Sequence, residues 1–293
     1  MNIKFITKRF LFWILPYFLY VWLRKISKPI FNRSRILALV KPNSRFKDIH
    51  KGKRCFILCN GPSINKQNLL LLKDEIIFSV SSGYHHKDYA VIRPKYHCVP
   101  PVTYGLITKR DVSDWFKEMD SKVGDAEIFL NYSEEQLIKS RNLFQGRSLN
   151  YFFMNNSFRD YSVEAIDISK EIPSVQSVSI MCLIIAVYMG FEQIYLLGVE
   201  HDSFKTKEYK YFYKPTVLKN KDFMVVKNDD LFLKQEELFS YAVLWSQYRK
   251  IKEIAIKNSI SIYNASLGGA LDIFERVSFE EVASSGKNNE NKG

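Results

Sequence analysis

Beyond residue 52 the sequence alternates short apolar runs with stretches of helical periodicity, and this alternation restricts the fold more than any other feature. The apolar runs predict buried strands at residues 54–60, 75–81, 95–99, 125–131, 149–154, 193–197 and 260–263. The helical stretches between them include residues 64–72, 178–189 and 229–258. Apolar strands that alternate with helices are typical of parallel sheets buried on both faces. The chain therefore predicts an α/β domain, in which helices cover both faces of a mostly parallel sheet.

Composition divides the chain into three parts. Residues 1–50 form a basic and apolar arm, residues 51–283 form the α/β domain, and residues 284–293 (SSGKNNENKG) form a polar tail that is expected to be disordered. Within the domain, residues 202–228 are aromatic and basic without a clear period, which predicts a long loop or lid.

The net charge of +12 lies almost entirely in the arm. Residues 1–54 hold 14 Lys and Arg against one acid, whereas the rest of the chain holds 29 against 30. A nucleic-acid-binding domain would carry a basic face of its own, so nucleic acid is not an expected partner. The basic arm instead suits an anionic membrane surface, where each Lys or Arg contributes about 1 kcal/mol of binding energy.

The arm contains an uncharged run over residues 10–23 (FLFWILPYFLYVWL). A helix of this length spans about 21 Å, less than the roughly 30 Å of a bilayer's hydrocarbon core. Its Trp and Tyr residues favour a helix that lies in the headgroup region, which predicts an anchor on the cytoplasmic face of the inner membrane. A short or re-entrant span and a plain first helix packed on the domain are the alternatives.

The turn after the first predicted strand is the first candidate site, because ligands of open α/β sheets bind at the carboxyl ends of strands. It reads Asn60, Gly61, Pro62, Ser63. Gly61 permits close approach of the backbone, Pro62 suits a helix start and Ser63 is a candidate helix cap. Free N–H groups at a helix start favour phosphate. A plain strand-to-helix turn is the alternative.

Two later segments carry further candidates. Ser177 and Ser179 stand at the start of the helix predicted over 178–189, where they would hold an anionic group or only cap the helix. Gly198, Glu200 and His201 follow the strand over 193–197. Glu200 suits a sugar hydroxyl, and His201 suits a general base near neutral pH. The alternative is a solvated acidic turn.

No spacing of residues indicates a metal site. The four cysteines lack a C-x-x-C pair, and no D-x-D motif occurs. His85 and His86 follow the second predicted strand without other ligands nearby in the sequence, so surface positions are expected for them.

Three segments together carry a family resemblance: ILCNGPSI, then QSVSIMCLIIAVYMGFEQIYLLGVEHDSF, then NASLGGALDIFERVSFEEV. Over residues 50–282 the chain resembles the 6-hydroxymethylpterin pyrophosphokinase-like domain, which also occurs in Maf-type motility-associated glycosyltransferases. More distantly it resembles the sialyltransferases of glycosyltransferase family 42. The resemblance implies a Rossmann-like nucleotide-binding domain, whose donor in the Maf and sialyltransferase relatives is a CMP-activated nonulosonic acid.

The resemblance also implies roles for individual residues. The residues assigned to nucleotide and phosphate binding are Asn60, Gly61, Pro62, Ser63, Ser81, Ser177, Ser179 and Gly198. Ser81 stands where the sialyltransferases place an asparagine, and Glu200 stands where Asp is commoner. His201 would take the catalytic role from a different position, because no His follows it. Tyr209, Tyr211 and Tyr213 lie in a stretch comparable to the paired tyrosines of the sialyltransferases and would form a lid; a strand face is the alternative.

Three functions are consistent with these features. The first is a membrane-associated glycosyltransferase that moves a nucleotide-activated sugar to a glycan or lipid-linked acceptor, in surface polysaccharide or glycoconjugate synthesis, with no obligatory metal. The second is ATP-dependent pyrophosphoryl transfer to a pterin-like substrate, which would need Mg²⁺ held by carboxylates such as Glu200 and Asp202. The third is a non-catalytic scaffold tethered to the membrane.

Overall fold

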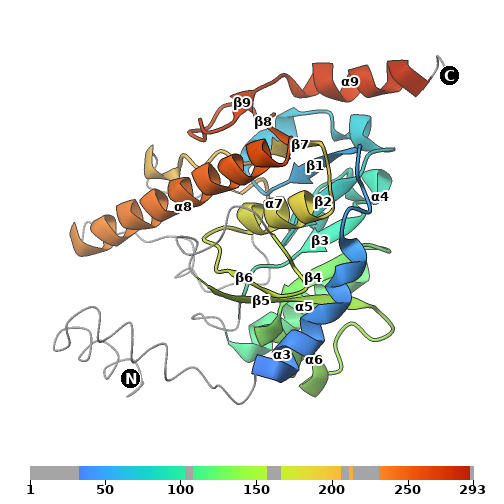
Figure 1. Ribbon diagram of the computed structural model, residues 1–293, viewed down its shortest axis with the longest axis vertical. Coiled ribbons are helices and arrows are strands. Elements are labelled where there is room, and N and C mark those ends of the chain that lie inside the picture. Colours follow the sequence, from blue (N-terminus) through green and yellow to red (C-terminus); the bar gives the residue numbers. More distant parts are fainter. Residues whose placement is uncertain (1–32, 103–107, 157–165, 206–210, 214–230, 291–293) are drawn as a thin grey trace.

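The computed structural model describes residues 33–102, 108–156, 166–205, 211–213 and 231–290, and these form one nine-stranded sheet with the order β6-β5-β4-β3-β2-β1-β7-β8-β9 (Figure 1). Every pair of neighbouring strands is parallel. The strands are β1 (Arg54–Leu58), β2 (Ile77–Val80), β3 (Tyr96–Cys98), β4 (Glu127–Asn131), β5 (Leu149–Asn156), β6 (Glu171–Pro173), β7 (Gln193–Leu197), β8 (Ser261–Asn264) and β9 (Glu275–Arg276). The predicted parallel α/β sheet is confirmed.

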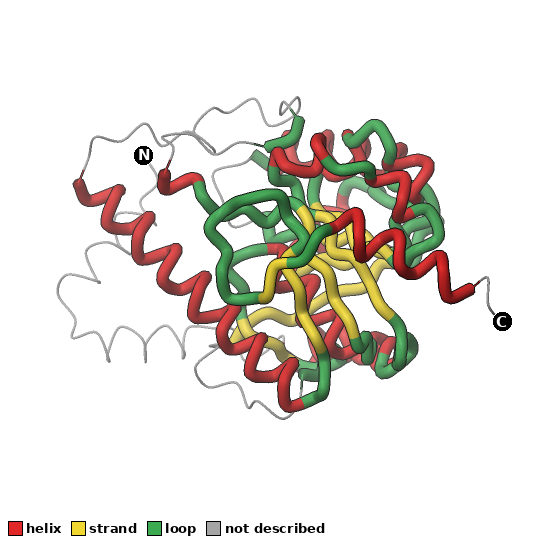
Figure 2. The backbone as a smooth tube through the Cα atoms, turned by 90° about the horizontal axis from the view of Figure 1, so that it is seen from above, coloured by secondary structure: helices red, strands yellow, loops and turns green. Residues whose placement is uncertain are grey.

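Helices enclose the sheet on both faces, as the view in Figure 2 shows. The α-helices are α3 (Arg33–Val40), α4 (Tyr89–Ile92), α5 (Lys109–Lys122), α6 (Glu135–Ser140), α7 (Val178–Tyr188), α8 (Leu231–Lys257) and α9 (Phe279–Glu290). Alternate residues of β1 belong to different hydrophobic clusters: Cys55 and Ile57 pack with α7, whereas Phe56 and Leu58 pack with Phe279 of α9. Because both faces of β1 are covered, its sequence is continuously apolar.

Several short elements differ from the sequence-based expectation. The helix predicted over 64–72 consists of two 3₁₀ turns, η3 (Pro62–Lys66) and η4 (Leu69–Leu72). A run of four leucines has no periodicity that separates one turn from a helix, so the pattern could not distinguish them. Strands β6 and β9 are three and two residues long and were not predicted.

Part of the segment assigned to the arm belongs to the folded domain, so the boundary at residue 50 was wrong. Helix α3 and the 3₁₀ helix η2 (Lys41–Phe46) bury Val40 and Phe46. The side chain of Asn43 donates hydrogen bonds to the carbonyls of Tyr151 and Ile168, at 2.7 and 3.0 Å. These contacts fix residues 33–50 against the sheet, whereas the apolar run at 10–23 lies outside the described residues.

The polar tail begins as a helix, so the expected disorder over 284–293 was wrong as far as residue 290. Helix α9 starts with Glu280 and Glu281 in its first turn, and acidic side chains stabilise the positive end of a helix. Phe279 and Ala283 bury its first two turns against the sheet. The remaining residues, 291–293, lie outside the described part.

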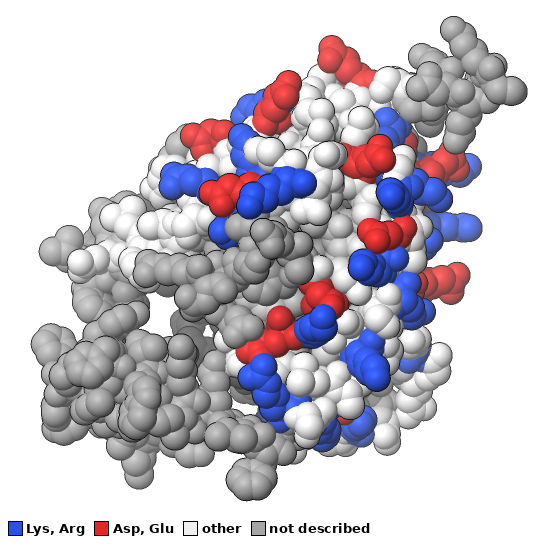
Figure 3. All heavy atoms as spheres, in the orientation of Figure 1, with Lys and Arg blue, Asp and Glu red and all other residues white. Residues whose placement is uncertain are grey.

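Among the described residues, no helix combines the length and apolar character that crossing a membrane requires. The surface seen in Figure 3 carries Lys and Arg interspersed with Asp and Glu.

Three histidines in the structure make the stability of the fold sensitive to acid. Burial lowers the pKa of His50 and His201 to about 4 and that of His97 to about 3. In the unfolded chain each histidine has a pKa near 6.5, so between pH 6.5 and 4 the unfolded state binds more protons than the folded state. The free energy of unfolding therefore decreases as the pH is lowered through this range. Urea unfolding at pH 7.5, 5.5 and 4.5 measures this fall.

The matched variant is His97→Asn, which removes the most deeply buried of the three imidazoles. Its free energy of unfolding is expected to be lower at pH 7.5 but to fall less between pH 6.5 and 4. If the free energy of unfolding depended equally on pH in the wild type and in His97→Asn, His97 would not contribute to that dependence.

Candidate functional site

The order in which strands are added to the parallel sheet reverses between β1 and β7. From β1 the chain adds β2 to β6 on one side, then returns through α7 to place β7 on the other side of β1. Helix α7 therefore starts at the carboxyl edge of the sheet and ends at the amino edge, where the N–H of His50 donates to the carbonyl of Met189. Ligands of open α/β sheets bind at such a reversal. The predicted site residues after β1 and β7 and at the start of α7 all lie on this edge.

The turns after β1 and β7 are joined through Glu200. The N–H of Gly61 donates to the carbonyl of Gly198 at 3.0 Å, and the N–H of Ser63 donates to Oε1 of Glu200 at 2.7 Å. Glu200 is buried and packs directly on Gly61. Gly198 has φ of +65°, and a side chain there would meet the carbonyl oxygen of Cys59 at 2.6 Å. Both glycines are required by this contact between the turns.

This pairing changes what the first turn offers to a ligand. The N–H groups of Gly61 and Ser63 already have hydrogen-bond partners, and Pro62 has no N–H group. The Glu200 carboxylate lies at the start of η3. The Ser63 hydroxyl makes no cap bond, contrary to the expectation of a helix cap. A second anion at this point would be repelled by Glu200. In this conformation the turn therefore presents oxygen atoms, not the free N–H groups that phosphate prefers.

Several of those oxygens are buried without a hydrogen-bond partner in the described part of the chain. They are Oδ1 of Asn60, Oγ of Ser63, Oε1 of Gln67 and Oε2 of Glu200. The amide of Asn60 is oriented by its Nδ2, which donates to the carbonyl of Val80 at 3.3 Å. Buried polar atoms are normally satisfied, and an unpartnered one costs about 1–3 kcal/mol. Amide and carboxylate oxygens accept only, so the group that satisfies them is a donor such as water, a hydroxyl or an amine.

A loop from the C-terminal part of the chain holds Glu200 in place. The N–H of Ala270 donates to the carbonyl of Glu200 at 2.6 Å, and a side chain on Gly269 would meet the Glu200 backbone. Arg276 donates to the carbonyls of Gly268 and Gly269 at 2.8 and 3.1 Å. The loop lies in the segment NASLGGALDIFER, but sequence reasoning did not identify Arg276 as its support.

His201 belongs to a chain of hydrogen bonds that reaches the start of α7. Its Nε2 lies 2.7 Å from the hydroxyl of Tyr248, which lies 2.5 Å from the hydroxyl of Ser179, which in turn lies 2.7 Å from that of Ser177. The Ser177 hydroxyl also caps α7 by accepting from the N–H of Ser179 at 3.3 Å. Sequence reasoning named three of these residues but missed Tyr248, because it lies 47 positions away on α8.

The surroundings of His201 are aromatic. Its ring lies 6.0 Å from that of Trp245 and 5.6 Å from that of Tyr248, both on α8. Burial alone lowers its pKa to about 4, so the imidazole is neutral at pH 7. His201 has a φ of +46°, in a region that residues other than glycine seldom adopt.

Ser81 and its neighbours connect the end of β2 with β3 and with Asn60. The N–H of Ser81 donates to the carbonyl of Cys98 at 3.0 Å, and the carbonyl of Ser81 accepts from Nε2 of His97 at 2.9 Å. A side chain on Gly83 would lie 3.4 Å from Oδ1 of Asn60. The end of β2 is therefore adjacent to the first turn.

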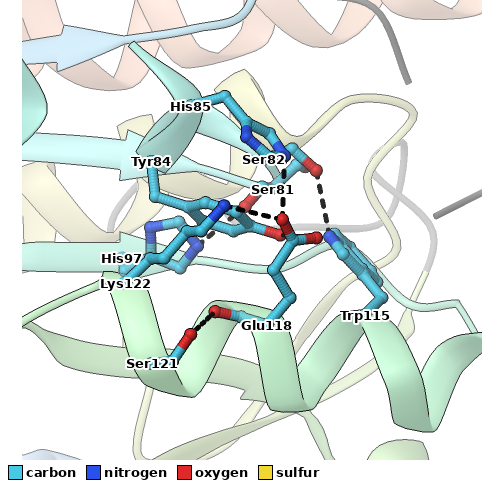
Figure 4. A network of polar contacts seen from close by, with 9 residues as sticks. All are labelled: Ser81, Ser82, Tyr84, His85, His97, Trp115, Glu118, Ser121 and Lys122. Carbon is cyan, nitrogen blue, oxygen red and sulfur yellow. Dashed lines mark hydrogen bonds and ion pairs between the residues drawn. The ribbon is translucent and has the colours of Figure 1, made fainter. Parts of the chain in front are cut away.

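His86 is buried, contrary to the expected surface position, and the side chain of His85 is only about one-fifth exposed. The side chain of His86 is fully enclosed, and its ring lies 5.5 Å from Phe212. His85 is part of a polar network at the end of β2, with Nε2 3.5 Å from Oε1 of Glu118 on α5 (Figure 4). Lys122 also donates to Oε1 of Glu118, at 2.8 Å. Burial lowers the pKa of both histidines, and for His85 the Glu118 charge opposes that effect.

The short segment 211–213 lies across these turns. The N–H of Phe212 donates to the carbonyl of Asn60, and Nδ2 of Asn65 donates to the carbonyl of Phe212, both at 3.0 Å. The rings of Tyr211 and Tyr213 stack 5.4 Å apart, and the ring of Tyr213 lies 5.3 Å from His85. Burial raises the pKa of both tyrosines. The position suits the predicted lid, although Tyr209 lies outside the described residues.

Within the described ranges, no group of three or more His, Cys, Asp or Glu side chains is arranged to hold a metal ion. The four cysteines are free and buried.

Comparisons with known proteins identified a family. A family model described as "6-hydroxymethylpterin diphosphokinase MptE-like" matches residues 32–205, more than half of the chain. The search of curated proteins found no match. A structure of the sialyltransferase CST-II with trisaccharide acceptor and CMP is 15% identical, with a TM-score of 0.43 over 76% of this chain and 85% of that chain. A CST-II variant with CMP is 13% identical, with a TM-score of 0.40 over 77% and 89%.

Proposed function

This chain belongs to the 6-hydroxymethylpterin diphosphokinase MptE-like family, and from that premise we propose that it is a transferase that binds a nucleotide-activated donor at the β1–β7 edge. The donor we propose is a nucleotide sugar, such as a CMP-nonulosonic acid. The acceptor is a glycan or lipid-linked glycan in surface polysaccharide or glycoconjugate synthesis.

The observation that supports this proposal is the set of buried, unpartnered oxygens at the first turn. They are Oδ1 of Asn60, Oγ of Ser63 and Oε2 of Glu200; Ser63 and Glu200 are joined by a direct hydrogen bond, and Asn60 belongs to the same turn as Ser63. Together they match a ligand with several hydroxyl groups, and both the ribose and the sugar of a nucleotide sugar have them. The aromatic side chains of the 211–213 segment and of α8 add apolar surface on which sugar and base rings pack.

The proposed reaction is displacement at the anomeric carbon of the donor. A hydroxyl oxygen of the acceptor forms the new glycosidic bond, and the bond from that carbon to the phosphate oxygen breaks. The nucleotide leaves with the electron pair, and the hydroxyl proton passes to a neutral imidazole at the edge. His201, which the sequence indicated, and His85 are the two candidates. No step requires a metal, so we expect activity to persist in EDTA.

The proposed place of action is the cytoplasmic face of the inner membrane. The argument for it is the sequence of residues 1–32, in which an uncharged run is bounded by Arg and Lys. Such a segment binds an anionic leaflet through both apolar contact and charge. A lipid-linked acceptor would then be presented in the same leaflet.

A second candidate is ATP-dependent pyrophosphoryl transfer to a pterin-like substrate, and the description of the matching family favours it. That reaction uses Mg²⁺, which takes six oxygen ligands. At the described edge Glu200 offers one unpartnered carboxylate oxygen, and its other oxygen accepts from Ser63. Because Mg²⁺ is usually held by one or two carboxylates together with phosphate and water oxygens, Glu200 would be the residue to hold it, and we derive no step through the ion.

Calorimetry on the full chain in detergent micelles tests the proposal. The ligands are CMP, UDP and GDP and their sugars, each with and without EDTA. A separate assay supplies ATP, Mg²⁺ and hydroxymethylpterin and measures AMP release. We expect one nucleotide class to bind, unaffected by EDTA, and no AMP release. AMP release would favour the second candidate, and no binding of any nucleotide would favour a scaffold.

A further inference from the structure

The polar network at the end of β2 contains an imidazole paired with a carboxylate. His85 follows directly from the β2 turn, and Glu118 comes from the last turns of α5. Nε2 of His85 lies 3.5 Å from Oε1 of Glu118, and both side chains are about one-fifth exposed (Figure 4). The same carboxylate accepts from Lys122 at 2.8 Å and from the Tyr84 hydroxyl at 3.5 Å. Two separate elements thus converge on one partly open imidazole.

This pair adjoins the proposed donor site. Strands β1 and β2 are neighbours, and neighbouring strands lie about 4.8 Å apart. Gly83, two residues before His85, faces Oδ1 of Asn60. The 211–213 segment bridges the two places, because Phe212 bonds to the carbonyl of Asn60 while Tyr213 lies on His85. His85 is therefore on one side of the Asn60 turn and His201 on the other.

The two histidines differ in their capacity to hold a proton. The ring of His201 contacts the neutral side chains of Tyr248 and Trp245, and burial lowers its pKa. No carboxylate is among the described contacts of that ring that could stabilise an imidazolium. At His85 the carboxylate of Glu118 opposes the effect of burial. A carboxylate beside a catalytic histidine orients the ring and stabilises the imidazolium that forms.

We propose that His85, oriented by Glu118, accepts the proton of the attacking hydroxyl, and that His201 does not. This inference rests on the proposed function. In the step, the hydroxyl O–H bond breaks, its oxygen bonds to the anomeric carbon of the donor, and the proton moves to the ring nitrogen of His85 that faces away from Glu118. The imidazolium is held by the Glu118 carboxylate until the proton passes to solvent.

The groups that face His85 determine how its titration responds to substitution. They are Tyr84 on its own turn, Glu118 and Lys122 on α5, and Tyr213 of the 211–213 segment. Glu118 raises the pKa of His85, and Lys122 lowers it. Glu118→Gln should therefore lower that pKa and Lys122→Met should raise it. Because an acceptor must be neutral, the acidic limb of the rate profile should move in the same two directions.

The experiment measures release of nucleotide from the bound nucleotide sugar, with water as acceptor, so that no acceptor need be known. His85→Asn is expected to lower the rate at least about 100-fold and to change the donor Kd less than about threefold. Glu118→Gln and Lys122→Met are expected to move the acidic limb by about one pH unit, down and up respectively. His50→Asn is the control, a buried histidine at the opposite edge of the sheet.

The outcomes separate this inference from the proposed function. A donor that binds and is hydrolysed equally by the wild type and His85→Asn overturns the role of His85, and loss of rate in His201→Asn alone would return that role to His201. Failure of every donor to bind overturns the proposed function. In that case NMR titration of His85 in the full chain still applies, and a pKa that does not respond to Glu118→Gln overturns the pairing.

Discussion

Gly61→Ala should destabilise the folded chain by about 3 kcal/mol, at the upper end of the cost of overpacking a close contact. A methyl group at this position would overlap the Glu200 carboxylate and lie 2.6 Å from the carbonyl oxygen of Gly198. The carboxylate is fixed by its bond to Ser63, and the carbonyl by its bond to Gly61 itself. Neither can move without separating the turns after β1 and β7.

Urea unfolding of the variant and the wild type measures this difference. The control is Gly83→Ala on the neighbouring turn, where a methyl group would lie 3.4 Å from Asn60 and 3.7 Å from Ser79. That variant should lose less than about 1 kcal/mol, because its new contacts are close to van der Waals distance. Equal stability of Gly61→Ala and the wild type would show that Glu200 does not pack on the first turn.

Glu200→Gln should weaken nucleotide binding by about 10- to 100-fold. The carboxylate has one oxygen bonded to Ser63 and one buried without a partner in the described structure, which we assign to a ligand hydroxyl. A hydrogen bond to a charged group contributes about 1.5–3 kcal/mol, which gives this factor. Glutamine keeps the size of the side chain, and its carbonyl can still accept from Ser63, but its amide replaces the accepting oxygen with a donor.

Calorimetry with the nucleotide that binds best tests this effect, and the sign of the result is informative. If the first turn instead bound the phosphate, loss of a negative charge would strengthen binding. Tighter binding by Glu200→Gln would therefore restore the phosphate interpretation and contradict the hydroxyl assignment. The control is Glu75→Gln, which removes the ion-pair partner of Arg54 at the amino edge of the sheet and should leave affinity unchanged.

The residues that lie at the carboxyl edge of the sheet were predictable, because they follow from the order of the strands and the direction of the chain. Once the apolar runs are read as parallel strands, residues 60–63 and 198–201 must emerge on the same edge, as must the start of the helix that connects to β7. The structure brings Ser177, Ser179 and His201 into one hydrogen-bonded chain and joins the β1 turn to Glu200. Those groupings follow from the order of strands and helices, and the periodicity of apolar residues in the sequence predicts that order well.

The chemical character of the edge was not predictable in the same way. The first turn looked suited to phosphate, yet its N–H groups are used by Gly198 and Glu200. Tyr248 and Glu118 belong to helices whose sequences look like ordinary amphipathic surface, so nothing local distinguishes them. His85 looked exposed because its partner comes from α5.

By itself the sequence determined the parallel sheet, its buried strands and the edge on which the polar residues gather, because each depends on periodicity within short segments. The charge division predicted at residue 54 does not follow the boundary of the fold, because residues 33–54 belong to the folded domain and hold eight of the Lys and Arg residues. Tertiary structure alone decided which of those polar groups are already paired and which remain unpartnered. A hydrogen bond depends on two positions in space, and Ser63 and Glu200, for example, are separated by 137 residues along the chain.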